Sequence, residues 1–356
     1  MKKIFVSELK PGMVLAKDVY NHADGRLLLL KGFILKPSYI EKLLSLSIMF
    51  VYIDDAEAVP VSKSDQFQDE KTYSEAFSTV ENVLTSVREG KSVEVTPVKD
   101  TVGEIVHRVM EDNNVYMPLS GIRDIDNYTF HHSVDVCIYS LITGKGLGLS
   151  VNELTDLGMG AILHDIGKCK VPLEILNKPG KLTDEEFQIM KLHSTYGYEI
   201  LYNSEGFTKR IADIAHQHHE RWDGSGYPSG FKEMEIDVFA RIVAISDVYD
   251  ALTADRCYRK KDLPNVVAEY ILNNTGKQFD SELANKFFNN ITIYPENCMV
   301  LLNTGEIGSI ADSNNNIQVR PKIKVIAKKS GPPLLEPYTL DLMENPNVFI
   351  VEIING

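Results

Sequence analysis

Cysteine, tryptophan, long apolar runs and excess positive charge are all scarce in this chain of 356 residues. The four cysteines are widely spaced and form no C-x-x-C pair, so no disulfide framework is expected. The longest apolar runs, such as Leu27 to Leu30, fall far short of a membrane span. The apolar run from Ile4 to Val6 behind the basic tip is too short for a signal peptide. A cytoplasmic location without membrane contact is therefore the default expectation.

The formal net charge of the chain is -13. An acidic chain without basic runs lacks the cationic footprint that polymeric nucleic acid requires. A small anionic substrate stays compatible with this charge, because bound metal ions are often the largest local charges in a site. With 44% hydrophobic and 24% charged residues, the composition is that of an ordinary globular protein with a sizeable core.

Changes in pattern along the chain divide it into four parts. Residues 1–55 carry turn signals, strand-like runs and a short helix, which is typical of a small mixed α/β accessory or sensing module. Residues 56–98 are expected to form a linker, up to Asp69, and then a connecting helix. Residues 99–292 predict a succession of helices, and residues 293–356 predict a small β module. The predicted fold class is mainly α, a helical bundle flanked by these two small modules.

Local signals support this division. Ser150 to Glu153 and Thr183 to Glu186 are capping boxes, each of which begins a helix. The connecting helix carries a heptad-like stripe that either packs on its own domain or forms a homodimer contact. Short strands are predicted near the C-terminus, including one over Ile317 to Val319. A turn-rich loop from Arg221 to Pro228 separates two of the central helices.

Several central helices place polar side chains on apolar faces. One histidine in such a place is more often a satisfied core residue than a ligand, but here the inward imidazoles and carboxylates accumulate, and burial of an unpaired charge is costly. Imidazole with carboxylate suits a borderline divalent metal such as iron, manganese or zinc. The pattern predicts a multi-metal cluster between helices. The inward residues are His164 with Asp165, His193, His218 with His219, Asp247, and either His131 or His132; His216 is an alternative to His218.

The same residues resemble the HD-GYP phosphodiesterases, a branch of the HD metal-dependent phosphohydrolases. Residues 164–168 (His-Asp-Ile-Gly-Lys) match the first signature of that family. Gly226-Tyr227-Pro228 matches the second signature, and the run from Asp247 to Thr253 matches a third, followed by Arg256, Tyr258 and Arg259. The resemblance covers about residues 100–290, and the joint match is far more specific than a lone His-Asp pair.

The resemblance implies a metal-dependent phosphodiesterase that hydrolyses cyclic di-GMP to linear pGpG, and in some members onward to GMP. It implies that Asp165 bridges two divalent ions, iron or manganese, which share the attacking hydroxide, and that Lys168 holds a phosphate oxygen. The implied metal ligands are His132, His164, Asp165, His193, His218, His219 and Asp247. The implied substrate contacts are Lys168, Tyr227, Asp250, Arg256 and Arg259.

One departure from the family pattern bears on the number of metals. Some members hold a third metal with a glutamate one turn before the first histidine, where this chain has Tyr128. The departure implies two metals and hydrolysis that stops largely at pGpG. Two other functions stay open: a phosphohydrolase of another nucleotide, such as a hybrid cyclic dinucleotide, and a module with little turnover that binds cyclic di-GMP or docks diguanylate cyclase-type partners through the Gly226-Tyr227-Pro228 loop.

Overall fold

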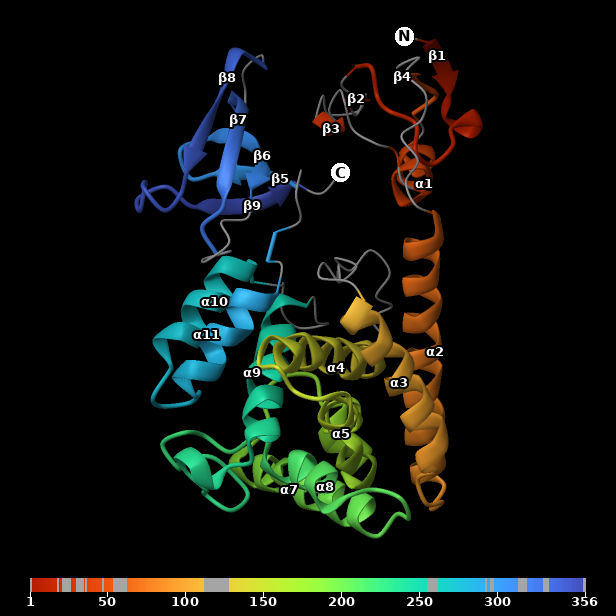
Figure 1. Cartoon of the computed structure of the whole chain (residues 1–356), viewed down its shortest axis with the longest axis vertical. Helices are drawn as coiled ribbons and strands as arrows, with labels where there is room; N and C mark the ends of the chain where they lie inside the picture. Colours follow the sequence, from red (N-terminus) through yellow and green to blue (C-terminus); the bar gives the residue numbers. More distant parts are fainter. Residues whose placement is uncertain are drawn as a thin grey trace.

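The computed structural model describes residues 2–17, 19–20, 27–29, 35, 37–46, 48–53, 63–111, 128–254, 262–291, 293–294, 298–312, 319–328 and 333–354. Small strands with one helix come first, a body of helices follows, and an antiparallel sheet ends the chain (Figure 1). The predicted fold class, mainly α with a small strand-containing part at each end, is confirmed. The domain boundaries predicted at residues 55, 98 and 292 stay predictions.

The N-terminal part has a small core of its own. Its elements are β1 (Lys2–Phe5), η1 (Val6–Glu8), β2 (Val19–Tyr20), β3 (Leu27–Leu29), α1 (Pro37–Ser45) and β4 (Phe50–Ile53). Strand β1 pairs antiparallel with β4, and β2 pairs antiparallel with β3. Helix α1 begins at a proline, whose missing N–H would have no partner in a first turn anyway. Leu15, Leu35 and Leu43 are buried in this core, which is separate from the core of the helical body.

The helical body supplies the scaffold for the polar cluster. Its elements are α2 (Lys63–Arg88), α3 (Val95–Glu111), α4 (Tyr128–Gly146), α5 (Val151–Ile162), η3 (Ile166–Lys170), α6 (Leu173–Leu176), α7 (Asp184–Tyr202), α8 (Lys209–Gln217), η4 (Glu233–Glu235), α9 (Val238–Thr253), α10 (Pro264–Asn273) and α11 (Ser281–Asn290). Helix α4 packs between α5 and α9, and α8 contacts α5, α7 and α9. Both predicted capping boxes are confirmed, at the starts of α5 and α7.

Helix α2 differs from its prediction at its start. The residues from Lys63 to Asp69 are helical, so the predicted linker is wrong over this stretch. The stretch lacks apolar periodicity, but a helix that is already anchored can be extended by its own backbone hydrogen bonds without a buried stripe. Further along, Val80 and Leu84 are buried in the core of the helical body. The heptad-like stripe therefore packs on its own domain, as the first of its two interpretations predicts.

The C-terminal sheet has the strand order β8-β7-β6-β5-β9, and all its pairs are antiparallel. Its strands are β5 (Met299–Leu302), β6 (Glu306–Asp312), β7 (Lys322–Lys328), β8 (Pro333–Asp341) and β9 (Ile350–Ile354). Strand β8 was not predicted, since it contains Pro333 and Pro337. Prolines cannot donate to a sheet, but β8 lies at an edge, where only one side is paired. The strand predicted over Ile317 to Val319 is wrong at Val319, which lies in a turn; Ile317 and Gln318 lie outside the described residues.

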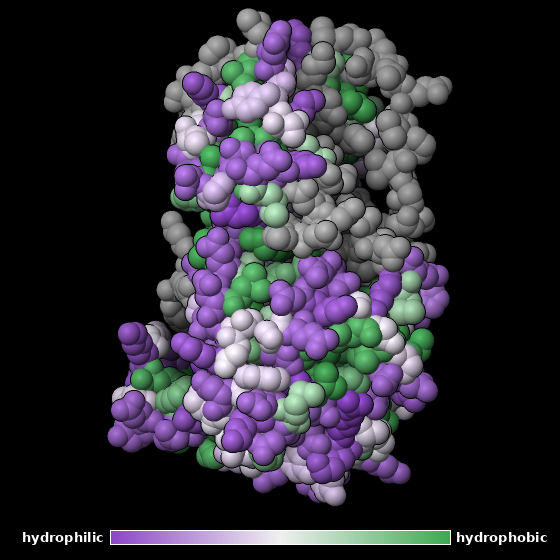
Figure 2. Space-filling view, turned by 60° about the vertical axis from the view of Figure 1, so that its left-hand side comes forward, coloured by the Kyte–Doolittle hydropathy of each residue, from purple (hydrophilic) through white to green (hydrophobic). Residues whose placement is uncertain are grey.

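The surface of the molecule is mixed in character. On the face shown in Figure 2, hydrophilic residues cover most of the helical body, and smaller hydrophobic patches lie between them. Among the helices that the structure describes, none is both long and apolar enough to cross a membrane.

The short helix η3 approaches α7 so closely that only glycine fits at residue 167. A Cβ on Gly167 would lie 1.9 Å from the carbonyl oxygen of His193 and 2.5 Å from the backbone nitrogen of Gly197. Both neighbours are backbone atoms of a packed helix, so neither can move aside cheaply. Gly167 thus allows the segment between Asp165 and Lys168 to lie directly against the turn that carries His193.

Replacing Gly167 with alanine should therefore destabilise the fold by about 1–3 kcal/mol, the usual cost of overpacking. The matched control is Gly103→Ala on α3, where an added Cβ meets no atom within 4 Å. That control should stabilise the protein by about 0.4–1 kcal/mol, because alanine restricts the unfolded chain. Urea unfolding of both variants checks the pair, and equal effects of the two substitutions would contradict the close approach of η3 to α7.

Candidate metal centre

Five segments of the helical body bring imidazoles and carboxylates to one place. The contributing segments are α4, the turn after α5, α7, the end of α8 and α9. The residues that they bring together are His132, His164, Asp165, His193, His218, His219 and Asp247, the seven predicted metal ligands. Asp247 joins the others through His132 Nε2, 3.1 Å from its Oδ1, and through His219 Nδ1, 4.0 Å from its Oδ2. The seven therefore form one continuous polar cluster inside an apolar body.

Asp165 is the centre of this cluster. One ligand atom from each of Asp165, His193, His218 and His219 lies within 4.8 Å of the other three. A second group with the same spacing consists of Asp165, His132 and His164. The carboxylate belongs to both groups, and its Oδ2 and Oδ1 lie 3.4 Å from His164 Nε2 and His193 Nε2 respectively. A carboxylate has two oxygens, so this geometry suits a bridge between two neighbouring cations.

The backbone fixes the orientation of three of the imidazoles. The Nδ1 atoms of His164 and His193 each donate to a carbonyl three residues earlier, those of Ala161 and Met190, at 2.7 Å. His218 donates in the same way to the carbonyl oxygen of Ala215, at 2.9 Å. With the proton on Nδ1, Nε2 presents a lone pair to the cluster, which is the arrangement that metal-ligating histidines show.

Charge and burial favour the ligating form of these side chains. Burial lowers the pKa of His193, and burial with the neighbouring His219 holds the pKa of His218 well below its usual range. Burial lowers the pKa of His219 to about 3. For Asp165 burial opposes ionisation, but the nearby Lys168 and His164 hold the pKa of its carboxyl well below its usual range. At neutral pH His193, His218 and His219 are therefore neutral imidazoles beside the Asp165 carboxylate, the states that bind metals. His132 differs, because its hydrogen bonds to Asp247 and Asp250 raise its pKa to about 9, so this ring would release a proton on binding a metal ion.

Two buried atoms at the heart of the cluster are left without hydrogen bonds. Within the part of the chain that the structure describes, His164 Nε2 and Asp165 Oδ1 have no hydrogen-bond partner. Leaving such groups unsatisfied costs about 1–3 kcal/mol each. A divalent ion would satisfy both atoms, and a mixed imidazole and carboxylate donor set is one that such ions accept. The residues present therefore fit a metal centre.

Lys168 and Tyr227 lie beside the cluster. The ammonium of Lys168 is 2.5 Å from Asp165 Oδ2, and about a third of its side chain (29%) is exposed. The ring of Tyr227 lies 4.8 Å from that of His219. Burial, together with the charges of Asp165 and Asp247, raises the pKa of Tyr227, so its phenol stays protonated and is a hydrogen-bond donor. Both side chains are thus suited to contact an anion next to the centre.

The loop that carries Tyr227 is held by a buried carboxylate. Glu220 accepts hydrogen bonds from the backbone N–H groups of Ser229, at 2.7 Å, and Gly230, at 3.1 Å, and only 4% of its surface is exposed. Gly226 folds back on the same segment, where a Cβ would lie 2.4 Å from the backbone nitrogen of Arg221. The loop is therefore closed onto the residues that directly follow His219.

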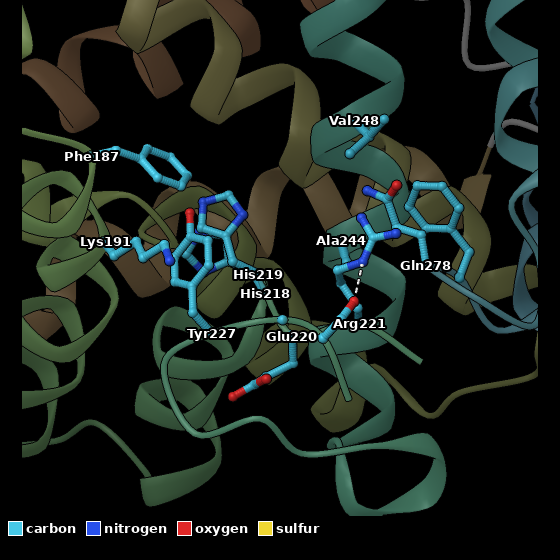
Figure 3. Close-up of a pocket in the computed structure, with 13 residues that line it drawn as sticks. Phe187, Lys191, His218, His219, Glu220, Arg221, Tyr227, Ala244, Val248 and Gln278 are labelled. Atoms are coloured by element: carbon cyan, nitrogen blue, oxygen red, sulfur yellow. Dashed lines mark hydrogen bonds between the residues drawn. The ribbon is translucent and has the colours of Figure 1, made fainter. Parts of the chain in front are cut away.

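A cavity of about 290 Å³ opens beside the cluster, with His218 and His219 in its lining. Figure 3 shows Phe187, Lys191 and Tyr227 gathered around His219 on one side of it. Arg221, Val248 and Gln278 lie on the other side (Figure 3), and Arg221 Nε donates to Ser225 Oγ at 2.9 Å. Lys191 Nζ lies 5.0 Å from the ring centre of Phe187 and 5.3 Å from that of Tyr227. The cavity thus combines ring faces and cations, which suits a nucleotide.

Comparisons with known proteins agree with this geometry. A family model described as an HD domain matches residues 128–283. The chain is 34% identical over 256 residues to a cyclic di-GMP phosphodiesterase of Pseudomonas aeruginosa, covering 71% of this chain and 61% of that relative. It is 43% identical over 171 residues to a cyclic di-GMP phosphodiesterase of Thermotoga maritima, covering 48% and 46% of the two chains. Residues 128–283 form an HD domain.

The prediction of an HD-GYP family member is confirmed. A 3'3'-cGAMP-specific phosphodiesterase of Vibrio cholerae is also similar, at 36% identity over 170 residues, 48% of this chain and 33% of that relative. The chain spans less than two thirds of the length of each of these relatives. A solved HDG"Y"P protein from Bdellovibrio bacteriovorus shares the fold, with a TM-score of 0.53 at 20% identity over 80% of this chain and 97% of that one. A model described as a KOW domain associated with an HD domain matches residues 299–356.

The structure shows which of the alternative histidines lie in the cluster, a choice that the sequence pattern left open. His132, and not His131, faces Asp247, since His131 turns to α2 and lies 3.1 Å from the hydroxyl of Tyr73. His218 belongs to the cluster, whereas His216 lies 3.1 Å from the hydroxyl of Ser229. Arg256 and Arg259 lie outside the described residues, as does the side chain of Tyr128. Their predicted roles stay predictions.

Asp250 does not lie where the prediction placed it. It was expected to contact substrate, but only 1% of its surface is exposed. Its Oδ2 lies 2.7 Å from His132 Nδ1, on the side of the ring opposite to Asp247. Asp247 and Asp250 are one turn apart on α9, so both face α4, and the ring of His132 stands between Asp250 and the cluster. Asp250 accepts the Nδ1 proton of His132 and thereby orients Nε2 toward the centre.

The residues that the sequence did not reveal are those of the cavity wall. Phe187 and Lys191 are four residues apart on α7 and share one stripe of that helix. No signal in the sequence indicated that this stripe faces the centre, because Lys191 and His193, two residues apart, do not lie on one side of a helix. Arg221 is the first residue of the predicted turn-rich loop, but it was not predicted to line the site. Gln278 comes from the connection between α10 and α11, and only the folded chain brings it to the cavity.

Substitution of Asp250 should act on the metal and not on substrate affinity. Asp250→Ala removes the acceptor for the His132 Nδ1 proton, so the affinity for metal should fall by about 10–100-fold. Asp250→Asn keeps an oxygen at that place and should lose less. Chelator competition measures the affinity, and KM for the nucleotide should stay unchanged once the metal is saturating. A raised KM with unchanged metal affinity would restore the predicted substrate contact.

Proposed function

We propose that this chain is a metal-dependent phosphodiesterase that hydrolyses cyclic di-GMP to linear pGpG. The observation that carries the proposal is the membership of Asp165 in both groups of imidazoles, beside Lys168 and a cavity lined with rings and cations. Phosphodiester hydrolysis needs an activated water and neutralisation of phosphoryl charge, and a two-metal site supplies both. The names of the relatives in Pseudomonas aeruginosa and Thermotoga maritima support the substrate.

The proposed cofactors are two divalent ions, iron or manganese. One ion would be held by His132, His164 and Asp165 with Asp247, and the other by Asp165, His193, His218 and His219. When bound, such ions lower the pKa of water toward neutrality and stabilise charge on phosphoryl oxygens. Tyr128 at the start of α4 offers no carboxylate for a third ion, and this supports the proposal that hydrolysis stops largely at pGpG.

The side chains around the centre have separate proposed tasks. Lys168, now paired with Asp165, would turn its ammonium to a phosphate oxygen of the substrate. Tyr227 would donate its phenolic proton to the same anion, since its raised pKa keeps the proton in place. Lys191 and Arg221 would bind the parts of the dinucleotide that extend into the cavity, where the rings of Phe187 and Tyr227 offer stacking surfaces. Arg256 and Arg259 stay predicted contacts.

A second candidate substrate is a hybrid cyclic dinucleotide. The observation that favours it is the similarity to the 3'3'-cGAMP-specific enzyme of Vibrio cholerae, which covers the same share of this chain, 48%, as the match to the Thermotoga maritima enzyme. A different candidate function is that of a docking module, in which the Gly226-Tyr227-Pro228 loop contacts diguanylate cyclase-type partners. The tight anchoring of this loop by Glu220 and the metal-ready cluster favour an enzyme.

The proposed activity is tested on protein purified without oxygen. We expect two ions per chain by elemental analysis and conversion of cyclic di-GMP to pGpG, with GMP appearing far more slowly. Asp165→Asn should lower metal affinity and turnover by more than about a hundredfold. Losing a residue that only hydrogen-bonds to a metal ligand costs about 10–100-fold in metal affinity or activity, and the loss of a ligand shared by two ions should cost more. The control is Glu199→Gln, which removes an exposed charge on the same domain.

Three results would contradict parts of this proposal. Faster turnover of 3'3'-cGAMP than of cyclic di-GMP would assign the hybrid substrate. Tight binding of cyclic di-GMP by metal-loaded protein without cleavage would support the docking module. Three bound ions with rapid release of GMP would overturn the argument from Tyr128.

Lys191 provides a separate test of the cavity. Lys191→Ala should raise KM for cyclic di-GMP about tenfold, a loss of about 1.4 kcal/mol of binding, with little change in kcat because the residue is remote from the reacting phosphate. The control is Lys209→Ala, which removes an exposed lysine paired with Asp213 on α8. An unchanged KM would exclude this wall of the cavity from the substrate site.

A further inference from the structure

Helix α2 lies outside the matched HD domain, yet it contacts two of the segments that build the metal centre. It descends from the N-terminal strands along one side of the helical body (Figure 1). Its described contacts include α3, α4 and η3. Helix α4 carries His132 and η3 carries Lys168, so one helix reaches two separate parts of the centre.

The contact with α4 is made by Tyr73. Its hydroxyl donates to Asp135 Oδ1 at 3.0 Å and lies 3.1 Å from His131 Nδ1. A hydroxyl has one proton, so the oxygen that donates to Asp135 accepts from the Nδ1–H of His131. The rings of Tyr73 and His131 stack, with centroids 5.8 Å apart and planes inclined by 19°. One turn later, Phe77 lies 4.7 Å from the ring of the same histidine.

The contacts of Tyr73 lie next to His132, a predicted metal ligand, on the side of α4 that faces α2. His131 immediately precedes His132, and Asp135 follows His132 by three residues. The two residues that Tyr73 contacts therefore lie on either side of His132 along α4. Asp135 is 1% exposed, and a buried carboxylate without its hydrogen bonds is costly. From the other side, Asp247 and Asp250 hold the ring of His132. The position of His132 therefore depends on α2 on one side and on α9 on the other.

Near its C-terminal end, α2 contacts η3, the second segment of the centre that it reaches. The thiol of Cys169 lies 3.5 Å from the carbonyl oxygen of Leu84, and Cys169 directly follows Lys168. Burial raises the pKa of this thiol, so it is a neutral donor and not a nucleophile. Four residues beyond Leu84, Arg88 acts in the opposite direction on the pKa of the same thiol.

We propose that Tyr73 is a positioning residue of the metal centre, acting through His131 and Asp135 on His132. The ion on the His132, His164 and Asp165 side then depends on Tyr73, whereas the ion held by His193, His218 and His219 does not. Because α2 is continuous from Lys63, a displacement of its N-terminal end would act first on the His132 side. The inference rests on the proposed two-metal centre, and it makes residues outside the HD domain part of that centre.

The test compares Tyr73→Phe with Tyr198→Phe in the full-length protein. Tyr198 is a partly buried tyrosine on α7 whose ring stacks on Tyr202, so it is a matched control. Manganese affinity is measured by chelator competition on folded, metal-free protein well below its unfolding temperature. Tyr73→Phe should weaken one of the two ions about tenfold and leave the other unchanged, while the control keeps both. Phe77→Leu, which keeps the hydroxyl of Tyr73, should weaken the same ion by a smaller factor.

Two results would overturn the inference: wild-type affinity for both ions in Tyr73→Phe, or equal weakening of both. The readout is independent of the substrate. If the wild-type protein binds two ions but cleaves no cyclic dinucleotide, the proposed function fails and the selective loss still decides the role of Tyr73. If the wild-type protein is active and Tyr73→Phe holds both ions normally, the inference alone fails.

Discussion

The structure depends on one buried carboxylate. Asp165 lies among imidazoles in an apolar body, where an ionised group is tolerated only if opposite charge compensates it. Lys168 supplies one charge, and the unsatisfied atoms Asp165 Oδ1 and His164 Nε2 leave room for more. The other buried residues of the helices that meet at this carboxylate are mostly apolar, so the cluster is the part of the core that depends on charge compensation. A metal ion bound at this place would therefore also stabilise the folded domain.

Much of the centre was predictable because its predicted ligands stand in short local patterns. The His-Asp pair, the paired histidines at the end of α8 and the carboxylate of α9 each interrupt an apolar stripe that the sequence displays. The role of Asp250 was not predictable in this way. Spacing places it on the same face as Asp247, but only the fold shows that the ring of His132 fills the space in front of it.

Other errors have equally specific causes. Strand β8 was missed because its prolines count against a strand, whereas its place at the sheet edge removes that objection. The first turns of α2 were assigned to a linker because a polar stretch shows no stripe. The cavity wall was missed because Lys191, Arg221 and Gln278 come from three separate segments. Tyr73 lies in a stripe that predicted packing, and nothing in that stripe indicated which histidine its hydroxyl meets.

The anchoring of the loop by Glu220 has a consequence for substrate binding. Its carboxylate ties down backbone groups two and three residues beyond Tyr227, so the loop is ordered before any ligand arrives. Ordering a residue costs about 1–2 kcal/mol of conformational entropy. That cost is met during folding here, so binding energy from the cavity contacts is not consumed in ordering Tyr227. In this respect the site is preorganised, and it can select ligands by their shape.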